Sequence, residues 1–385
     1  MKPTSALRLF VLLALCCLLA AACNEREAGS SRAVPEPTRI EQGTWSGFPA
    51  GLPDAFVRGV TAANWFTHRS DARLIPGWPD ASDFGRMRKL GLRHVRVLLD
   101  PDWLQMNAAH PRYVDAGLRQ ALDAGLMVVL SMQPSSEHKQ RMAREEAAVE
   151  ALAAQWTLIA SVFASIPVDR LVFEVLNEPE TEDVARAMRI QQRLIDVVRA
   201  VTPGRVVVVG GAHFSDIADL VALQPLPLPG VVYSFHFYEP HNFTHQGATW
   251  GWPMWMLLRD MPYPSSPEAL APVLPKLAEV AREHAAWYGQ QSWNKARLAE
   301  FIDQAANWSQ KHRVPVWCSE FGVLREAVPP DSRRAWLGDA RSLFESRDIA
   351  WTYFDWWGHF GLVTGTPGAR AVDPDVAVGL GLNAE

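Results

Sequence analysis

Cysteine is scarce in this sequence, and its distribution excludes a disulfide framework. Three of the four cysteines, Cys16, Cys17 and Cys23, lie in or directly after an apolar N-terminal segment, which leaves only Cys318 in the rest of the chain. A fold without disulfides must be stabilised by its core. With 385 residues, 48% of them hydrophobic, the sequence can supply the core of one large domain.

Motifs that bind nucleic acids, metals or nucleotide cofactors are also missing. The net charge is −5 and there is no basic run, so we expect no nucleic-acid partner. His241 and His245 have the spacing of a metal pair, but they stand in a segment interrupted by Pro and Gly and lack a supporting Glu. We interpret them as cleft or loop residues, so we expect neither a metal nor a cofactor. Serine-based catalysis is not expected either, because no Gly-x-Ser-x-Gly motif is present.

The N-terminus has the pattern of an export signal. Lys2 and Arg8 precede an apolar run from Leu9 to Ala22, which is too short to span a membrane comfortably. Cys23 follows small residues, as in a bacterial lipobox, so residues 1–22 are predicted to be a lipoprotein-type signal and Cys23 the lipidated residue. Plain secretion is the alternative. Asn24 is not the Asp that retains many lipoproteins at the inner membrane, which favours a periplasmic or cell-surface lipoprotein of the outer membrane.

The rest of the chain is predicted to be a short linker and one domain. Residues 23–53 are rich in Glu, Arg, Pro, Gly and Ser and are expected to be a flexible linker. Residues 54–385 are expected to be the catalytic domain. No later stretch is apolar enough to cross a bilayer, so membrane contact is expected only through the lipid anchor. We expect a monomer.

Within 54–385, short apolar strands alternate with segments of helical periodicity. The expected strands are 56–60, 92–99, 126–132, 171–176, 205–209, 231–237, 314–319 and 349–354. Eight buried strands separated by helices favour a closed (β/α)₈ barrel, the TIM barrel, as a single domain. An open doubly wound sheet is the alternative, but no Gly-x-Gly-x-x-Gly follows the first strand.

The connection after the sixth strand is long and aromatic. Residues 239–292 are predicted to be a loop that walls the cleft, and Trp250 is its first candidate for contact with a ligand. The sequence holds 16 tryptophans, an excess that suits a cleft in which flat ligands such as sugar rings stack.

Two glutamates stand at the ends of apolar strands. Glu178 follows the strand at 171–176 and precedes Pro179, and a residue before proline is excluded from the α region, so we expect Glu178 to be extended. Glu320 ends the strand at 314–319. Strands four and seven lie on opposite sides of an eight-stranded barrel, so the two carboxylates can face each other over its mouth, as in a glycosidase. The alternative is that each glutamate makes a surface salt bridge.

Further polar residues interrupt other strands. Arg96 stands within an apolar strand and needs a buried anion, which the nucleophilic carboxylate would provide. His236 and Tyr238 alternate with two Phe, so the polar pair shares one face of the sixth strand. The Tyr238 hydroxyl could keep a nucleophilic glutamate ionised. Glu174 is expected to be a buried structural acid.

The chain resembles glycoside hydrolase family 5, the retaining (β/α)₈ enzymes that include many bacterial cellulases and mannanases. The resemblance extends from about Phe56 to the C-terminus and rests on six motifs. These are Arg58-Gly59-Val60 with Asn64-Trp65, Val95-Arg96-Val97, 176–179 (Leu-Asn-Glu-Pro), His236-Phe237-Tyr238, 317–322 (Trp-Cys-Ser-Glu-Phe-Gly) and 351–357 (Trp-Thr-Tyr-Phe-Asp-Trp-Trp).

The resemblance implies a role for each matching residue. Glu178 would be the acid/base and Glu320 the nucleophile, with their carboxyl groups about 5 Å apart. Asn177 would bind the sugar 2-hydroxyl. The nucleophile and its surroundings would be held by Arg96, His236 and Tyr238. Asn64 would belong to the same cleft.

The sequence departs from the family pattern at two positions. Gln133 stands where a His is frequent, and Phe354 stands where a Trp usually forms the floor of the cleavage subsite. Trp356, two residues further on, is predicted to share the face of Phe354 and to take over the stacking. Both departures leave the preferred sugar open.

We expect a retaining glycoside hydrolase that cleaves internal β-glycosidic bonds of a polysaccharide. The first hypothesis for the substrate is a β-1,4-glucan, as for a cellulase. The alternatives are a β-mannanase, an exopolysaccharide-degrading hydrolase, and a catalytically inactive sugar-binding lipoprotein.

Overall fold

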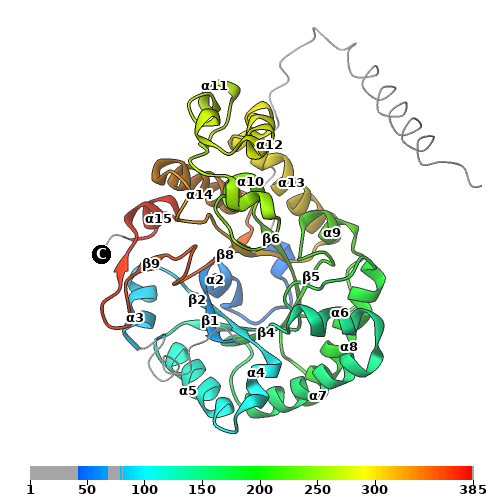
Figure 1. Ribbon diagram of the computed structural model, residues 1–385. Helices are drawn as coiled ribbons and strands as arrows, with labels where there is room; N and C mark the ends of the chain where they lie inside the picture. Colours follow the sequence, from blue (N-terminus) through cyan, green and yellow to red (C-terminus); the bar gives the residue numbers. More distant parts are fainter. Residues whose placement is uncertain (1–41, 68–78, 80, 384–385) are drawn as a thin grey trace, which may run out of the picture. The chain divides into compact units, whose positions relative to one another are not determined.

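Eight parallel strands, each hydrogen-bonded to the next, close into a barrel in the computed structural model (Figure 1). The strands are β1 (Arg58–Phe66), β2 (His94–Leu99), β3 (Met127–Met132), β4 (Leu171–Glu174), β5 (Val207–Gly210), β6 (Val231–Phe237), β7 (Val316–Phe321) and β8 (Ala350–Tyr353). The predicted (β/α)₈ barrel is therefore confirmed. The structure describes residues 42–67, 79 and 81–383, so the predicted signal, Cys23 and residues 24–41 of the predicted linker lie outside the described residues.

Helices pack around the outside of the barrel (Figure 1). Apart from the helices of the segment between β6 and α13, which are described below, those between consecutive strands are α3 (Ala81–Lys89), α4 (Pro101–Met106), α5 (His110–Asp123), α6 (Ser136–Arg144), α7 (Glu146–Val162), α8 (Val184–Val201), α9 (Ile217–Ala222), α13 (Lys295–His312) and α14 (Pro330–Glu345). Several begin at a side-chain cap. The Asp183 carboxylate, for example, accepts a hydrogen bond from the Arg186 amide at the start of α8. In the described part of the chain, no helix has the length and hydropathy to cross a membrane.

Alternation of side chains along the strands separates two apolar layers. On β3, Val128 and Leu130 belong to the layer between strands and helices, whereas Met127 and Val129 belong to the barrel interior. The next inward position is Ser131, which is buried and polar. On β3, the inward face is thus apolar near the amino end of the strand and polar near its carboxyl end.

The chain N-terminal to the barrel is part of the core, contrary to the predicted linker boundary. The 3-10 helix η2 (Gln42–Trp45) and helix α2 (Leu52–Phe56) precede β1, and Leu52 and Phe56 are fully buried against the barrel interior. Trp45 packs against this cluster. The expected first strand at 56–60 is therefore shifted. Phe56 ends a helix that covers the amino ends of the strands, and β1 begins at Arg58.

The segment after β6, predicted to be a loop over 239–292, contains several helices, most of them short. It contains α10 (His241–Thr244), η4 (Pro253–Leu257), α11 (Pro267–Leu270), η5 (Leu274–Lys276) and α12 (Glu279–Gln290). Figure 1 shows α10, α11 and α12 together on one side of the barrel. Its aromatic residues are partly used in packing, since Phe243, Tyr263 and Tyr288 are buried.

The C-terminal residues complete the domain after β8. Two short antiparallel strands, β9 (Val363–Thr364) and β10 (Ala371–Val372), are followed by α15 (Pro374–Gly379). Helix α15 packs against α14. Cys318 on β7 is a free, buried cysteine.

Candidate active site

The structure brings Glu178 and Glu320 to the same cleft at the carboxyl ends of the strands, as predicted. The cleft has a volume of about 290 Å³. Its lining consists of Asn64, Leu98, Gln133, Asn177, Glu178, Tyr238, His245, Trp250, Glu320, Phe354, Asp355, His359 and Phe360. Eight of the residues chosen from the sequence therefore border one cavity: Asn64, Gln133, Asn177, Glu178, Tyr238, Trp250, Glu320 and Phe354.

Glu178 has a backbone conformation that the sequence analysis did not expect. Its φ is +47°, in the left-handed region that non-glycine residues seldom adopt, and not the extended conformation predicted from Pro179. Such a conformation costs about 1–3 kcal/mol and persists only where the surroundings hold it. Here the preceding amide of Asn177 donates to the Met132 carbonyl at 2.8 Å, and the Phe214 amide donates to the Pro179 carbonyl at 3.3 Å. Neighbouring elements thus fix the chain on both sides of Glu178.

Glu320 reaches the barrel interior through a shift in strand register. Between β6 and β7, Phe235 pairs with Cys318 but His236 pairs with Glu320. Strict alternation from the inward-facing Trp317 would turn Ser319 inward. Because the register shifts by one residue, Glu320 points inward, and Phe321 joins the outer apolar layer.

Arg96 and Tyr238 hold the Glu320 carboxylate from two sides. Arg96 donates through Nη1 to Glu320 Oε1 at 2.6 Å, and the Tyr238 hydroxyl donates to Glu320 Oε2 at 3.0 Å. Burial and the charge of Glu320 raise the pKa of Tyr238 well above its usual value, so the phenol remains a donor. The expected contact between Arg96 and the proposed nucleophile is therefore present.

Arg96 also organises the groups around Glu320. Its Nε donates to Glu174 Oε2 at 2.6 Å, and its Nη2 donates to Ser131 Oγ at 3.3 Å and to Asn177 Oδ1. Burial opposes the charge of Arg96, but the two carboxylates raise its pKa, so it stays protonated. Glu174 is buried and paired with Arg96, which confirms it as a structural acid.

Asn177 links this network to the other cleft wall. Its Nδ2 donates to Gln133 Oε1 and lies 3.4 Å from Glu178 Oε2. Gln133, which replaces the frequent His, thus fixes the orientation of the Asn177 amide. The Asn177 Oδ1 accepts from Arg96, and its Nδ2 is directed to Gln133 and Glu178. Only one orientation of the Asn177 amide makes both sets of contacts.

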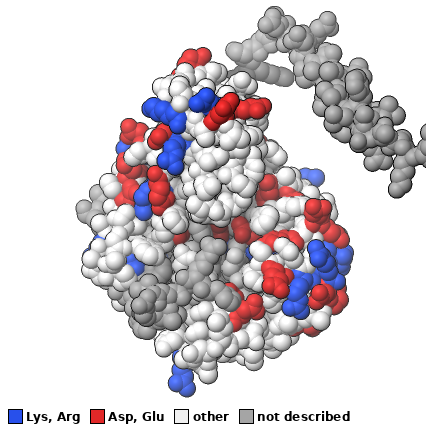
Figure 2. Space-filling model, viewed as in Figure 1, with Lys and Arg blue, Asp and Glu red and all other residues white. Residues whose placement is uncertain are grey.

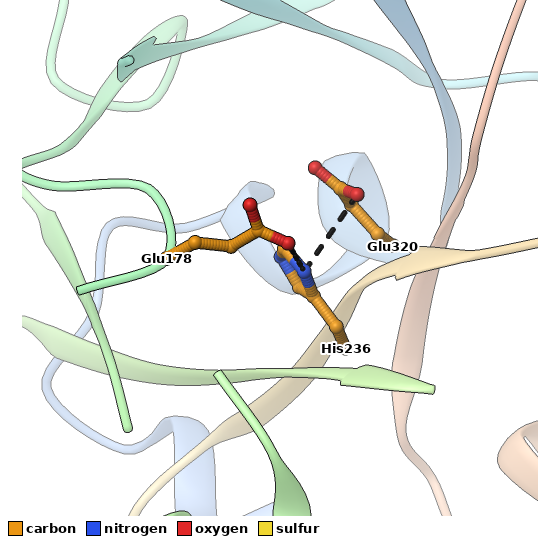
Figure 3. A group of neighbouring side chains, drawn as sticks. All are labelled: Glu178, His236 and Glu320. Carbon is orange, nitrogen blue, oxygen red and sulfur yellow. Dashed lines mark hydrogen bonds and ion pairs between the residues drawn. The ribbon is translucent and has the colours of Figure 1, made fainter. Parts of the chain in front are cut away.

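His236 lies between the two glutamates (Figure 3). Its Nδ1 is 3.0 Å from Glu178 Oε1 and 3.6 Å from Glu320 Oε2. Burial would lower the pKa of His236, but the negative charge of Glu320 and the hydrogen bond and charge of Glu178 raise it. The net effect is a raised pKa, so His236 holds a proton more tightly than a free imidazole does. As period two predicted, His236 and Tyr238 share one face of β6, and Phe235 and Phe237 lie in the outer layer.

The charge of His236 dominates the environment of Glu178. Burial of the carboxyl group opposes its ionisation. The hydrogen bond and charge of His236, with smaller contributions from Lys139 and Arg96, nevertheless lower the pKa of Glu178 to about 2. Lys139 is a buried residue of α6 whose Nζ lies 3.6 Å from Glu180 Oε1. The two shifts together favour a proton on His236 over a proton on Glu178.

The same three side chains form the one group that could ligate a cation among the described residues. One potential ligand atom from each of Glu178, His236 and Glu320 lies within 4.8 Å of the others. The carboxylate oxygens already accept hydrogen bonds from His236, Arg96 and Tyr238, which satisfies them without an ion.

Aromatic and histidine side chains form the rest of the cleft wall. His245 and Trp250 come from the segment after β6, and their rings are 6.5 Å apart. Burial, and the neighbouring His241, lower the pKa of His245 to about 3, so this imidazole is neutral. His245 is therefore a cleft residue, one of the two interpretations given for it, cleft or loop.

The prediction for Trp356 was wrong. This side chain is fully buried outside the cleft, and its Nε1 donates to Asp83 Oδ1 at 3.3 Å. Strand β8 ends at Tyr353, so alternation does not continue to position 356. Phe354 alone of this pair borders the cleft.

Sequence reasoning missed four cleft residues, Leu98, Asp355, His359 and Phe360. Asp355 could have been found from the sequence, because it is an acid that follows an apolar strand, the pattern that identified Glu178 and Glu320. It is 2% exposed, and its Oδ1 has no hydrogen-bond partner among the described residues. Burial, opposed by Arg325 and reinforced by Glu320, raises the pKa of Asp355 to about 7.

Comparison with known proteins gives a consistent family match. Residues 59–360 match the model of the family described as cellulase (glycosyl hydrolase family 5). The chain is 27% identical to endoglucanase 3 of Fibrobacter succinogenes, over 84% of the chain and 52% of that protein. It is 28% identical to endoglucanase C of Acetivibrio thermocellus, over 48% of the chain and 54% of that protein. The matches thus cover about half the length of these two relatives.

Solved structures share the fold at lower sequence identity. A hyperthermophilic endo-β-1,4-glucanase in complex with substrate superposes with a TM-score of 0.71 at 20% identity, covering 86% of this chain and 98% of the other. Cel5A of Thermotoga maritima in complex with cellobiose superposes with a TM-score of 0.69 at 22% identity, again covering 86% and 98%. At these identities the likeness concerns the fold alone.

Proposed function

The chain belongs to glycosyl hydrolase family 5, and we propose that it is a retaining endo-β-glycanase in which Glu178 is the acid/base and Glu320 the nucleophile. The observation that carries this proposal is the proximity of the two carboxylates, which have oxygen atoms within 4.8 Å of each other across the cleft. Retaining glycosidases separate their carboxyl groups by about 5 Å, because the nucleophile must reach the anomeric carbon directly. Inverting enzymes need about 6.5–9.5 Å to fit a water molecule.

In the first step, a carboxylate oxygen of Glu320 attacks the anomeric carbon while Glu178 gives its proton to the glycosidic oxygen. The bond between the anomeric carbon and that oxygen breaks, and its electron pair stays on the departing sugar. The products are an ester between Glu320 and the glycosyl unit, and a released sugar hydroxyl. Arg96 and Tyr238 hold the Glu320 carboxylate in position for this attack.

In the second step, Glu178 acts as a base. It accepts a proton from a water molecule whose oxygen attacks the anomeric carbon, and the ester bond to Glu320 breaks. The configuration at the anomeric carbon is inverted twice and therefore retained. Glu320 leaves as a carboxylate, and Glu178 is again protonated.

The acid step requires the proton to be on Glu178, whereas the free site holds it on His236. His236 Nδ1 and Glu178 Oε1 are 3.0 Å apart, so a single transfer along this hydrogen bond supplies the acid. Substrate that fills the cleft removes water from the pair, and a less polar environment favours a neutral imidazole and carboxylic acid over two ions. We therefore propose that substrate binding itself loads the acid.

We propose a β-1,4-glucan as substrate and internal cleavage as the mode of action. Support comes from the family match and from the relatives named endoglucanase. Gln133 and Phe354 leave a β-mannan as the second candidate, since both departures from the family pattern lie in the wall of the cleavage subsite.

The test is a screen of soluble β-glucan, xyloglucan, mannan and xylan with the wild-type protein and with Glu320→Gln. The wild type is expected to release oligosaccharides from a β-glucan with a rapid fall in viscosity, and Glu320→Gln to be at least about 1,000-fold slower. Glu178→Ala should regain activity with azide, which enters as an external nucleophile. Binding of oligosaccharides without hydrolysis of any polymer would instead support the sugar-binding alternative.

We also propose export and lipidation at Cys23. The support is the N-terminal pattern of charged, apolar and small residues that ends at Cys23. Incorporation of labelled palmitate into the wild type, and its loss in Cys23→Ala, is the expected result. Labelling that persists in Cys23→Ala would exclude this site.

A further inference from the structure

Two half-exposed tryptophans stand on the segment after β6, outside the catalytic cleft. Trp252 is 40% exposed and Trp287, on α12, is 51% exposed. Neither belongs to the cleft lining. Met256 and Val280 of the same segment are also exposed. Several exposed apolar side chains on one segment indicate a binding surface more than isolated ones do.

The two tryptophans lie on either side of His284. The Trp252 ring meets the His284 ring edge to face, with centroids 4.8 Å apart and an interplanar angle of 87°. His284 and Trp287 are three residues apart on α12, and residues at this spacing are neighbours on a helix face. Trp252 thus contacts His284, and His284 is a helical neighbour of Trp287; we call these three residues the aromatic strip.

The backbone beside Trp252 is fixed by a third aromatic ring. Gly251 has a φ of +73°, and a Cβ atom at this position would lie 2.4 Å from the Trp255 ring. The Trp255 ring stacks on His241, with centroids 5.6 Å apart and an interplanar angle of 11°. The chain between Trp250 and Trp252 therefore rests on a packed ring, and Trp252 is held in place before any ligand binds. Such preorganisation lowers the entropic cost of binding.

The strip continues the wall of the cleft. Trp250 lines the cleft and is itself 40% exposed, and only Gly251 separates it from Trp252. In Figure 2, charged side chains gather at the outer tip of the α10–α12 segment, and a broad area nearer the barrel is uncharged. Exposed indole rings suit a neutral ligand with flat apolar faces.

We propose that Trp252 and Trp287 form a distal binding surface for the β-glycan chain, beyond the cleft and continuous with it through Trp250. The proposal rests on the function proposed above. In a β-linked chain of pyranoses, the ring faces carry only C–H groups, and these stack on indole faces. The surface holds part of a long polymer while another part occupies the cleft. It makes the protein selective for polymers over short oligosaccharides and leaves the chemistry unchanged.

The experiment compares a polymer with a substrate too short to reach the strip. Trp252→Ala, Trp287→Ala and the double variant are assayed on soluble β-glucan and on p-nitrophenyl β-cellobioside. Each single change should lower kcat/KM on the polymer by about threefold to tenfold, with a larger loss in the double variant. Activity on the aryl cellobioside should stay within about twofold. Tyr113→Ala, an exposed aromatic on α5, is the matched control and should alter neither value.

The outcomes separate this inference from the proposed function. If the wild type hydrolyses both substrates and the variants keep its ratio of polymer to aryl-glycoside activity, the distal surface is refuted while the function stands. If the wild type hydrolyses nothing, binding is measured instead as slowed migration of the protein in gels that contain β-glucan or glucomannan. Slowed migration of the wild type that is reduced in the tryptophan variants would support the distal surface. A wild type that neither hydrolyses nor is retained overturns both.

Discussion

Nη1 of Arg96 lies 2.6 Å from Oε1 of Glu320, and both side chains are buried at the carboxyl end of the barrel. The same guanidinium donates to Glu174. One buried cation thus compensates two buried carboxylates, and removal of the cation would leave both without their main partner.

Arg96→Met is therefore expected to destabilise the protein by about 3–5 kcal/mol, because it leaves uncompensated buried charges. Denaturant unfolding at pH 7 measures this loss. Arg119→Met is the control. Arg119 pairs with Asp115 on the exposed face of α5, and such pairs contribute less than about 1 kcal/mol. An Arg96→Met protein as stable as the wild type would contradict the buried network.

Tyr238→Phe is expected to lower kcat by about 10-fold to 100-fold, with little change in KM. The change removes the hydrogen bond to Glu320 Oε2, and a bond to a charged group contributes about 1.5–3 kcal/mol. Tyr263→Phe is the matched control. Its hydroxyl donates to Asp339 at 2.9 Å outside the cleft, so this variant should lose stability and keep its kcat. Equal kcat in Tyr238→Phe and wild type would remove Tyr238 from the mechanism.

The pair of Glu178 and His236 should make stability depend on pH at both ends. The lowered pKa of Glu178 contributes stability that is present above pH 4.5 and is lost as pH falls toward about 2. The raised pKa of His236 contributes stability that is fully present below pH 6.5 and is lost as pH rises through its folded value. His236→Asn should therefore be less stable than wild type by about 1–3 kcal/mol near pH 5–6, and the difference should narrow at pH 2 and pH 9. Unfolding curves at these values measure it. A difference independent of pH would refute the charged pair.

Asp355 should change stability with pH in the sense opposite to Glu178. Its pKa is raised from 3.8 to about 7, so the folded protein holds this proton more tightly than the unfolded chain and loses stability as pH rises from 4 to 7. Asp355→Asn lacks this titrating group. Its free energy of unfolding relative to the wild type is therefore expected to rise between pH 4 and pH 8, by at most about 4 kcal/mol. Asp331→Asn, at an exposed position on α14, should show no such gain. The gain would be absent if Asp355 were ionised throughout this range.

The two aromatic positions after β8 should separate stability from activity. Phe354→Ala is expected to lower kcat/KM by about 10-fold, because Phe354 borders the cleft and we propose that its ring packs against the sugar. Trp356→Phe should keep kcat/KM and lose about 1–3 kcal/mol of stability, since the buried Trp356 indole donates to Asp83. A loss of kcat/KM in Trp356→Phe, with kcat/KM unchanged in Phe354→Ala, would instead support Trp356 as the residue that stacks on the sugar.

Much of this protein follows from local sequence pattern. Short apolar runs separated by helical segments predict the barrel, because strands and helices have different hydrophobic periods. An acid at the end of each of two runs predicts that Glu178 and Glu320 share the carboxyl face, since parallel strands all end on one face. The period of two along β6 correctly places His236 and Tyr238 together.

Other features were decided only by tertiary structure. Alternation along β7 would turn Ser319 inward, and Glu320 faces the cleft because pairing with β6 shifts the register by one residue. Glu178 adopts a positive φ that Pro179 does not dictate, because contacts of its neighbours with β3 and with the chain after β5 fix the turn. The sequence specifies periodicity and chemistry, which are local. The register between strands and the path of a turn depend on contacts between residues far apart in the chain, and these contacts set the direction of both glutamates.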